Sequence, residues 1–189
     1  MCGIAGFFDS RGQFSEIVNE IIDGMSQVIH HRGPDHQGLW ISQDKRLAMG
    51  HRRLSILDLT SEGNQPMVSH SGRYVIVFNG EIYNFKSLRD QLKNKNLRGS
   101  SDTEILLKTI EEKGLNHTLQ FLEGMFAFAL LDKENNKLFL VRDRLGEKPL
   151  YFAIHDGILI FASELKSLKY HPGFRKELDT RSAALYFQY

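Results

Sequence analysis

The chain begins Met1-Cys2-Gly3-Ile4-Ala5-Gly6-Phe7-Phe8, and Cys2 is its only cysteine. An initiator methionine is normally removed ahead of a small residue, and removal would leave Cys2 with a thiol and a free α-amine. Their ordinary pKa values are about 8.5 and about 8, so both groups exchange protons near neutral pH. One residue can therefore supply the nucleophile and the base of an acyl transfer. The apolar run behind Cys2 predicts a buried strand, which argues against an accidental cysteine on a loose terminus.

The composition fits one folded domain, or one domain with a fragment of another. Of the 189 residues, 41% are hydrophobic, and the formal net charge of +1 favours neither nucleic acid nor a membrane surface as a partner. A single cysteine excludes an internal disulfide framework and is typical of a reducing, cytoplasmic compartment. The apolar runs fall short of the roughly 20 residues that a membrane span needs. The short N-terminal run has no basic region before it, unlike a signal peptide.

Hydrophobic periodicity predicts both strands and helices, without strict alternation between them. The predicted strands are 4–8, 39–41, 47–49, 74–78, 125–131, 138–141, 150–154 and 158–162, and the predicted helices are 15–30, 84–93 and 101–111. Asn84 is predicted to cap the second helix, and Ser101-Asp102-Thr103-Glu104 has the capping-box pattern. This order favours an α+β fold of two stacked, mainly antiparallel sheets with helices on both outer faces.

Asn79-Gly80 follows the apolar run 74–78, and this pair predicts a turn at the end of a strand. An Asn side-chain amide next to a Gly backbone N–H supplies two donors close together, which is what a tetrahedral oxyanion requires. The alternative is a plain hairpin turn. The residues after the pair begin a helix rather than a returning strand, which argues against that alternative.

Arg53 and Asp102 are candidates for holding the two charged groups of an amino acid. An arginine at the end of an apolar segment can bind a carboxylate through two parallel hydrogen bonds, and an aspartate can hold an ammonium group. Each has a simpler alternative. Arg53 could be a surface residue, and Asp102 could complement the dipole of the helix that it opens.

Histidines and one charged loop offer other functions. None of His30, His31, His36 and His51 falls in the Cys/His spacing of a metal site, so no metal is expected. The segment 142–149 is a charged stretch between strands. It fits either a solvated hairpin loop or a surface between domains.

Several strings together resemble the glutaminase domain of class II glutamine amidotransferases, and most of all that of glutamine-hydrolysing asparagine synthetases. They are Met1-Cys2-Gly3-Ile4-Ala5-Gly6, His31-Arg32-Gly33-Pro34-Asp35, Arg53-Leu54-Ser55-Ile56, Phe78-Asn79-Gly80-Glu81-Ile82-Tyr83-Asn84, Ser101-Asp102-Thr103-Glu104, Gly124-Met125-Phe126-Ala127-Phe128-Ala129 and Arg142-Asp143-Arg144-Leu145-Gly146. The resemblance spans nearly the whole chain in order. It implies an N-terminal-nucleophile (Ntn) hydrolase fold, a four-layer αββα sandwich.

The resemblance implies roles for the catalytic candidates. Cys2 matches the nucleophile, with its own α-amine as base, and Asn79 and Gly80 match the two oxyanion donors. Arg53 matches the residue that binds the α-carboxylate of L-glutamine. Asp102 matches the residue that binds the substrate amine.

The resemblance also implies supporting residues around the substrate. Glu81 lies beside the group that holds the amine, and the backbone at Leu54 and Ile56 lines the pocket. Arg32 and Gly33 belong to a loop that closes over glutamine. No metal ligand is implied.

Residues 2–170 are expected to form the glutaminase domain, and 171–189 to begin a linker or helix toward an ATP-dependent synthetase domain. The Ser-Gly-Gly-x-Asp-Ser loop of that domain occurs nowhere in the sequence. No cofactor is therefore expected in this chain, and ATP and magnesium are expected only with the synthetase domain. A stand-alone domain with a docked terminal helix is the alternative. A homodimer is left open.

The expected function is glutamine hydrolysis that supplies ammonia for the amidation of aspartate. Three alternatives stay open. The acceptor could be a sugar-acid carboxylate in surface polysaccharide synthesis. The enzyme could be another Ntn amidohydrolase, such as an acylase or peptidase, or the domain could be a catalytically silent regulatory module.

Overall fold

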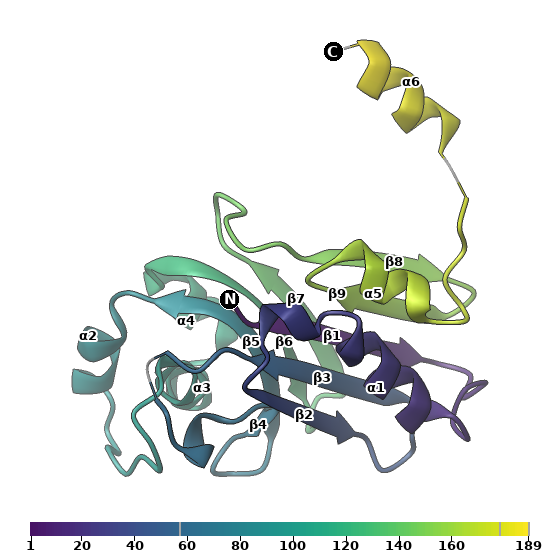
Figure 1. The fold of residues 1–189 in the computed structure, drawn as a ribbon. Helices are drawn as coiled ribbons and strands as arrows, with labels where there is room; N and C mark the ends of the chain where they lie inside the picture. The colour runs from purple at the N-terminus through teal and green to yellow at the C-terminus, as the bar shows by residue number, and fades with distance from the viewer. Residues whose placement is uncertain (57, 178, 189) are drawn as a thin grey trace.

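The computed structural model describes residues 1–56, 58–177 and 179–188, which form two stacked antiparallel sheets with helices outside them (Figure 1). The first sheet has the order β2-β3-β1-β9-β8 and the second the order β4-β5-β6-β7. The strands are β1 Gly3–Asp9, β2 His36–Ile41, β3 Leu47–Arg53, β4 Met67–Val68, β5 Tyr74–Ile82, β6 Gly124–Asp132, β7 Lys137–Arg142, β8 Tyr151–His155 and β9 Ile158–Ala162.

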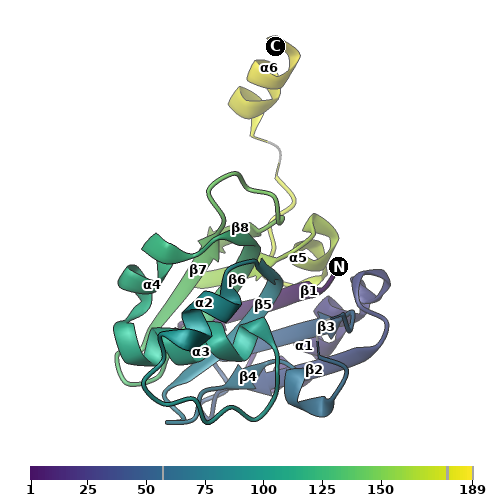
Figure 2. The ribbon, with the colours of Figure 1, turned by 90° about the vertical axis from the view of Figure 1, so that its left-hand side faces the viewer.

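Helices cover the outer face of each sheet, as Figure 2 shows from the side. The first sheet is covered by α1 Val18–Gln27 and α5 Leu165–Tyr170, and the second by α2 Phe85–Asp90, α3 Asp102–Lys113 and α4 Leu115–Phe121. Two 3₁₀ turns, η1 His30–Arg32 and η2 Ser61–Gly63, complete this part, and α6 Thr180–Gln188 stands clear of the sheets (Figure 1). The predicted four-layer αββα sandwich is confirmed.

Alternation along the strands decides which side chains lie between the sheets. The inter-sheet layer is apolar and consists of Ile4, Leu47, Met49, Val75, Val77, Ala129 and Phe161. The intervening residues of the same strands face outward and pack under the helices, Ala5 and Phe7 under α1 and Ile76 and Phe128 under α3. Each large apolar side chain buried in this way contributes about 1.5–3 kcal/mol.

The inter-sheet layer becomes polar toward the end where β1 begins. Cys2 precedes Ile4 on the inward face, His51 and Arg53 follow Met49, and Asn79 follows Val77. The same alternation that builds the core therefore places four polar side chains at one end of it.

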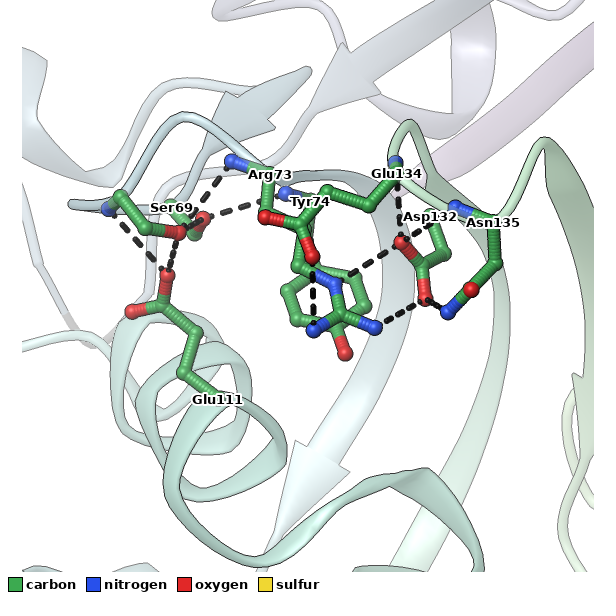
Figure 3. A network of polar contacts seen from close by, with 8 residues as sticks. Ser69, Arg73, Tyr74, Glu111, Asp132, Glu134 and Asn135 are labelled. Atoms are coloured by element: carbon green, nitrogen blue, oxygen red, sulfur yellow. Dashed lines mark hydrogen bonds and ion pairs between the residues drawn. The ribbon is translucent and has the colours of Figure 1, made fainter.

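A polar network lies at the opposite end of the β5–β6 pair, on the outer face that the helices cover (Figure 3). Asp132, the last residue of β6, accepts from Nε and Nη2 of Arg73 at 2.9 and 2.6 Å. It also accepts from the backbone N–H groups of Glu134 and Asn135 and from Nδ2 of Asn135. These hydrogen bonds hold the pKa of Asp132 well below its usual range. The network joins the start of β5 to the β6–β7 hairpin.

Two local predictions are wrong. Asn79-Gly80 does not turn, because β5 continues through the pair to Ile82 and stays in register with β6 along its whole length. Asn84 precedes α2 but does not cap it. Its side chain instead donates to the Phe121 carbonyl at 2.7 Å and accepts from the Glu123 N–H. In both places tertiary pairing overrides a local preference.

The predicted helix over 15–30 is shorter in the structure. Residues 15–17 form turns before α1, and the chain after α1 enters η1. The predicted cap of α3 is confirmed, because Oγ of Ser101 accepts from the Glu104 N–H at 3.2 Å. The Glu104 carboxylate does not complete the capping box and accepts instead from the N–H groups of Arg98 and Gly99.

Candidate active site

A cavity of about 110 Å³ lies at the polar end of the inter-sheet layer. The predicted catalytic and glutamine-binding residues all line it, namely Cys2, Arg53, Leu54, Ile56, Asn79, Gly80, Glu81 and Asp102. Arg32 and Gly33 are not on its wall. The structure thus gathers residues that are up to 100 positions apart into one small space.

Cys2 reaches this cavity because it continues β1 beyond its last cross-strand pair, Gly3 with Arg52. Its Sγ lies 3.4 Å from the N of Leu54 and 3.6 Å from the O of the same residue. Burial raises the pKa of the thiol, and the hydrogen bond with Leu54 offsets this only in part. A thiol with a raised pKa is mostly protonated at pH 7, so the nucleophile needs a base beside it.

Met1 occupies the place where that base would be. It lines the cavity, and its Sδ lies 2.9 Å from Nζ of Lys148. While Met1 is attached, the nitrogen of Cys2 belongs to a peptide bond and accepts no proton. A role for this nitrogen as base therefore requires removal of Met1.

Asn79 brings an unsatisfied donor to the cavity. The residue is 1% exposed, and its Nδ2 has no hydrogen-bond partner in the described part of the chain. A buried polar group without a partner costs about 1–3 kcal/mol and is rare in folded proteins. Such a donor, fixed on a strand and facing a nucleophile, suits an oxygen that becomes negatively charged.

The backbone N–H of Gly80 is the second donor. The N–H groups of Phe78 and Ile82 on either side point away from β6, since they donate to Oε1 of Gln65 at 2.6 Å and to Oδ2 of Asp102 at 2.9 Å. Alternate residues of a strand direct their N–H groups to the same side. The Gly80 N–H therefore points the same way, between two satisfied donors.

Two observations explain why this donor stays available. Phe126, the cross-strand partner of Gly80, makes its own backbone hydrogen bonds with Asp143 on its other side. On the near side β4 begins at Met67, opposite Ile76, so no described strand covers β5 at the level of Gly80. Gly80 also permits the close pairing with β6, because a Cβ here would lie 2.3 Å from the carbonyl oxygen of Met125.

Arg53 lies at one side of the cavity and is partly engaged. Its Nη1 donates to the Thr60 carbonyl and to Oδ1 of Asn64, each at 2.7 Å, and its Nη2 donates to the Asp58 carbonyl. A guanidinium group has five N–H donors, so two are left for a ligand. The same bonds hold the loop 58–64 in place and fix the direction of the guanidinium plane.

Asp102 lies at the other side, and no cationic side chain pairs with it within the described part of the chain. It is 5% exposed, and Oδ2 accepts from the Ile82 N–H. Burial raises the pKa of this carboxyl, and the negative charge of Glu81 raises it further. A substrate ammonium group beside Asp102 would lower this pKa and so oppose both effects.

Three other predicted residues take supporting places. Glu81 follows Asn79 on the inward face of β5, and Leu54 contacts Sγ of Cys2 through its backbone. Ile56 stands at the mouth of the cavity with 71% of its surface exposed. Their roles toward glutamine stay predictions.

Arg32 and Gly33 lie behind Cys2. Nε of Arg32 donates to the Cys2 carbonyl at 2.9 Å. Gly33 packs so closely on β3 that a Cβ would lie 2.4 Å from the carbonyl group of Arg52. The closing of this segment over glutamine stays a prediction, and its position in the structure is that of a support for the nucleophile.

Four residues that were not among the predicted site residues also line the cavity, namely His51, Gln65, Thr103 and Lys148. His51 is fully buried, burial lowers its pKa to about 3, and the ring is therefore neutral. One ring nitrogen bonds the Phe78 carbonyl at 3.1 Å, and Nδ1 has no partner among the described residues. The two-residue spacing from Arg53 along β3 was a signal that could have placed His51 here.

Metal binding and membrane insertion have no support in the described residues. Within 1–56, 58–177 and 179–188 no cluster of His, Cys, Asp and Glu side chains is suited to a metal ion. None of the helices described is long and apolar enough to cross a membrane.

Comparison with known proteins agrees with this geometry. The chain is 42% identical over 184 residues to asparagine synthetase [glutamine-hydrolyzing] 2 of Bacillus subtilis, an alignment that covers 97% of this chain and 24% of the relative. It is 39% identical over 170 residues to asparagine synthetase B [glutamine-hydrolyzing] of Escherichia coli, covering 89% of this chain and 30% of the relative. The chain thus spans about a quarter to a third of the length of these two relatives.

A solved structure shows the same fold at lower identity. Glutamine phosphoribosylpyrophosphate amidotransferase of B. subtilis superposes with a TM-score of 0.69 at 21% identity, covering 89% of this chain and 43% of that one. The sequence profile of the glutamine amidotransferase domain matches residues 1–189, the whole chain. The chain therefore belongs to the glutamine amidotransferase domain family, with the fold of an Ntn amidotransferase.

Proposed function

We propose that this domain hydrolyses L-glutamine to glutamate and ammonia through a thioester on Cys2. One observation carries the proposal: the buried Nδ2 of Asn79, unpartnered among the described residues, and the Gly80 N–H, which points away from β6, share a cavity with the Cys2 thiol. Paired donors facing a nucleophile fit the attack of a thiol on a carbonyl carbon. Family membership and the relatives named glutamine-hydrolysing support glutamine as the source of that carbonyl.

Substrate binding uses the two charged walls of the cavity. The α-carboxylate of glutamine accepts from the two unused N–H groups of Arg53, and its ammonium group pairs with Asp102. This arrangement directs the side-chain amide toward Cys2. It also replaces the missing cation beside Asp102, so binding relieves an unfavourable charge in the free protein.

The chemistry then proceeds in two stages. Sγ of Cys2 bonds to the amide carbon while the α-amine, freed by removal of Met1, takes the thiol proton. The oxyanion rests on Asn79 and Gly80, and removing one such donor typically costs about 10²–10³ in rate. The carbon–nitrogen bond breaks, and the protonated amine gives its proton to the departing ammonia. Water then adds to the thioester, releasing glutamate and restoring the thiol.

In the whole protein we infer that the ammonia amidates aspartate in an ATP-dependent synthetase domain to which residues 171–189 lead. The length of the relatives supports a further domain, and their names support asparagine as product. ATP and magnesium belong to that domain, and this chain needs no cofactor for the hydrolytic half. Amidation of a sugar-acid carboxylate is the alternative outcome of the same hydrolysis.

The test compares free glutamine with peptide amides as substrates for the chain beginning at Cys2. We expect glutamate and ammonia in equal amounts from glutamine, and no release from peptide amides, because a peptide lacks the free carboxylate and amine that Arg53 and Asp102 bind. Preferential cleavage of peptide amides would assign the site to an acylase or peptidase. Incubation with ATP, magnesium and aspartate is expected to give no asparagine from this chain.

A further inference from the structure

Glu164 connects the far side of the first sheet to the nucleophile. It lies between β9 and α5, and its Oε1 accepts from Nη1 of Arg32 at 3.2 Å. Nε of the same arginine donates to the Cys2 carbonyl at 2.9 Å. Carboxylate, guanidinium and nucleophile backbone thus form one continuous chain of hydrogen bonds.

The path of Arg32 explains how it reaches Cys2 from behind. Its side chain lies across Gly3 of β1, where a Cβ would lie 3.3 Å from Cδ and 3.4 Å from Cβ of Arg32. A larger residue at position 3 would crowd this path. The thiol of Cys2 faces the inter-sheet cavity, while its carbonyl is held by the guanidinium of Arg32.

The neighbouring residue ties the same segment to the same strand. Ser163 is fully buried, its N–H donates to the Ile4 carbonyl at 2.9 Å, and its Oγ accepts from the Ile4 N–H at 3.0 Å. Successive residues, Ser163 and Glu164, therefore hold the backbone of β1 directly and through Arg32. This double attachment is what a fixed N-terminal nucleophile requires.

The carboxylate of Glu164 is well suited to hold a cation in place. Its side chain is 25% exposed, and His31 and Lys166 also contact it, at 2.9 and 3.2 Å. Burial opposes ionisation, but the bonds from His31, Arg32 and Lys166 outweigh it and lower the pKa. Glu164 is therefore ionised at neutral pH, and its bond to Arg32 is charge-assisted.

We propose that Glu164 is a positioning residue for the proposed glutaminase reaction, which fixes the backbone of Cys2 through Arg32 and so sets the α-amine against the thiol. It touches neither glutamine nor the reacting atoms. Its loss is expected to slow the chemical step while leaving glutamine binding on Arg53 and Asp102 almost unchanged. The inference rests on the proposed function, and it predicts a separation of kcat from KM.

The first test measures kinetics per active site in the chain beginning at Cys2. Sites are titrated with a glutamine-like diazoketone, so that misfolded protein is not counted. Glu164→Ala is expected to lower kcat per site about tenfold, with KM within about twofold. Glu164→Gln keeps an oxygen that accepts from Arg32 and is expected to fall between the alanine variant and the parent.

Lys166→Gln is the matched control. Lys166 contacts the other oxygen of the same carboxylate, Oε2, and is 49% exposed. Its substitution is expected to leave kcat and KM within about twofold of the parent. Two outcomes would overturn the proposal. One is an equal loss of kcat in the Lys166 and Glu164 variants. The other is a Glu164→Ala variant whose lower total activity is accounted for by fewer titrated sites, with kcat per site unchanged.

A second measurement separates this inference from the proposed function. The pH at which iodoacetamide alkylates Cys2 at half its maximal rate reports the pKa of the thiol. Without Glu164 the α-ammonium is expected to move away from the thiol, and the midpoint is expected to rise. A fall in the midpoint, as loss of a negative charge alone produces, or no change, would contradict positioning. A parent protein that alkylates normally but leaves glutamine intact would contradict only the proposed function.

Discussion

The two ends of the β5–β6 pair differ in how their polar groups are satisfied. At the end near Asp132, the Asp132 carboxylate accepts from the Arg73 guanidinium and from the Asn135 amide (Figure 3). At the Cys2 end, donors on Asn79 and Gly80 line the cavity, and Asp102 forms no ion pair with any described side chain. A second cavity, lined by residues that include Phe8, Trp40 and Leu131, is much larger than the cavity at Cys2, about 870 Å³ against about 110 Å³. Convergent unsatisfied groups, rather than volume, distinguish the site.

The difference has a structural origin in the edges of the second sheet. Beyond Ile76, no described strand lies beside β5 on the β4 side, because β4 is only two residues long. The side chains of Gln65 and Asp102 accept from the N–H groups of the residues on either side of Gly80. The Gly80 N–H between them remains available to a ligand. An incomplete edge therefore leaves the N–H that we propose as an oxyanion donor, while a completed hairpin adds hydrogen bonds at the other end.

The largest expected effect is the loss of the nucleophile at the site end. Cys2→Ala is expected to reduce glutamine hydrolysis by about 10⁴ or more. The melting temperature is expected to stay within about 2 °C, because the side chain lost is small. Ammonia release and thermal melting measure the two effects. Cys2→Ser is expected to retain little activity, since a hydroxyl is the weaker nucleophile. Substantial activity in the alanine variant would exclude the thioester.

The next effect contrasts the side-chain amide of Asn79, whose Nδ2 has no partner among the described residues, with that of Asn135, whose Nδ2 donates to Asp132. Asn79→Ala is expected to lower kcat by about 10²–10³ with little change in KM, because it removes an oxyanion donor. Asn135→Ala, at the other end, is expected to leave kcat unchanged and to lower the free energy of unfolding by about 0.5–1.5 kcal/mol. Kinetics and denaturant unfolding of both variants decide the matter. If Asn79→Ala and Asn135→Ala lowered kcat to a similar extent, Asn79 would have no special role in the reaction.

Asp102→Asn sharpens the comparison by separating binding from stability. KM for glutamine is expected to rise about 10- to 100-fold, because the substrate ammonium loses a charged partner. The raised pKa of Asp102 means that ionisation opposes folding, and that stability is lost as pH rises through this pKa. The variant is therefore expected to melt a few degrees higher at neutral pH, the shift that about 1 kcal/mol produces. An unchanged KM would remove Asp102 from the pocket.

In the parent protein, the same titration is expected to appear in the kinetics. Glutamine binding needs the ionised carboxylate, so kcat/KM is expected to fall as pH drops through the raised pKa of Asp102. The acid limb of the profile is expected to weaken in the Asn variant.

The smallest expected effect concerns the hydrogen-bonded network at Asp132. The lowered pKa of Asp132 means that its contribution to stability is present above the unfolded pKa of about 3.9 and is lost at lower pH. Asp132→Asn is expected to melt below the parent at pH 7, and the gap is expected to narrow as pH falls below about 4. Activity at neutral pH is expected to stay the same. If the difference in melting temperature between parent and variant did not depend on pH, the charge of Asp132 would not contribute to stability.

Much of the fold could be predicted from the sequence, because periodicity is a local property that burial on one face enforces. The strands over 125–131, 138–141 and 158–162 lie within the observed β6, β7 and β9. The short helices α4 and α5 were not predicted. Each has only about two turns, too few for a periodic pattern to stand out.

The site was predicted as a set of residues but not as a geometry. Asn79-Gly80 favours a turn locally, and only pairing with β6, some 45 residues away, keeps it extended. The bond from Arg32 to Glu164 spans 132 positions, and no local pattern signals it. Such contacts follow from the stacking of the two sheets, which the sequence pattern specifies only as a class.

The place of β1 has a consequence for how the protein loses activity. β1 is the middle strand of its sheet, paired with β3 on one side and β9 on the other. Chain ends usually fray first, and their amide hydrogens exchange fastest. Here the N-terminal strand can separate from its neighbours only when the sheet itself opens. Thermal inactivation is therefore expected to coincide with global unfolding, and the amides of Ile4 and Ala5 are expected to exchange as slowly as any in the core.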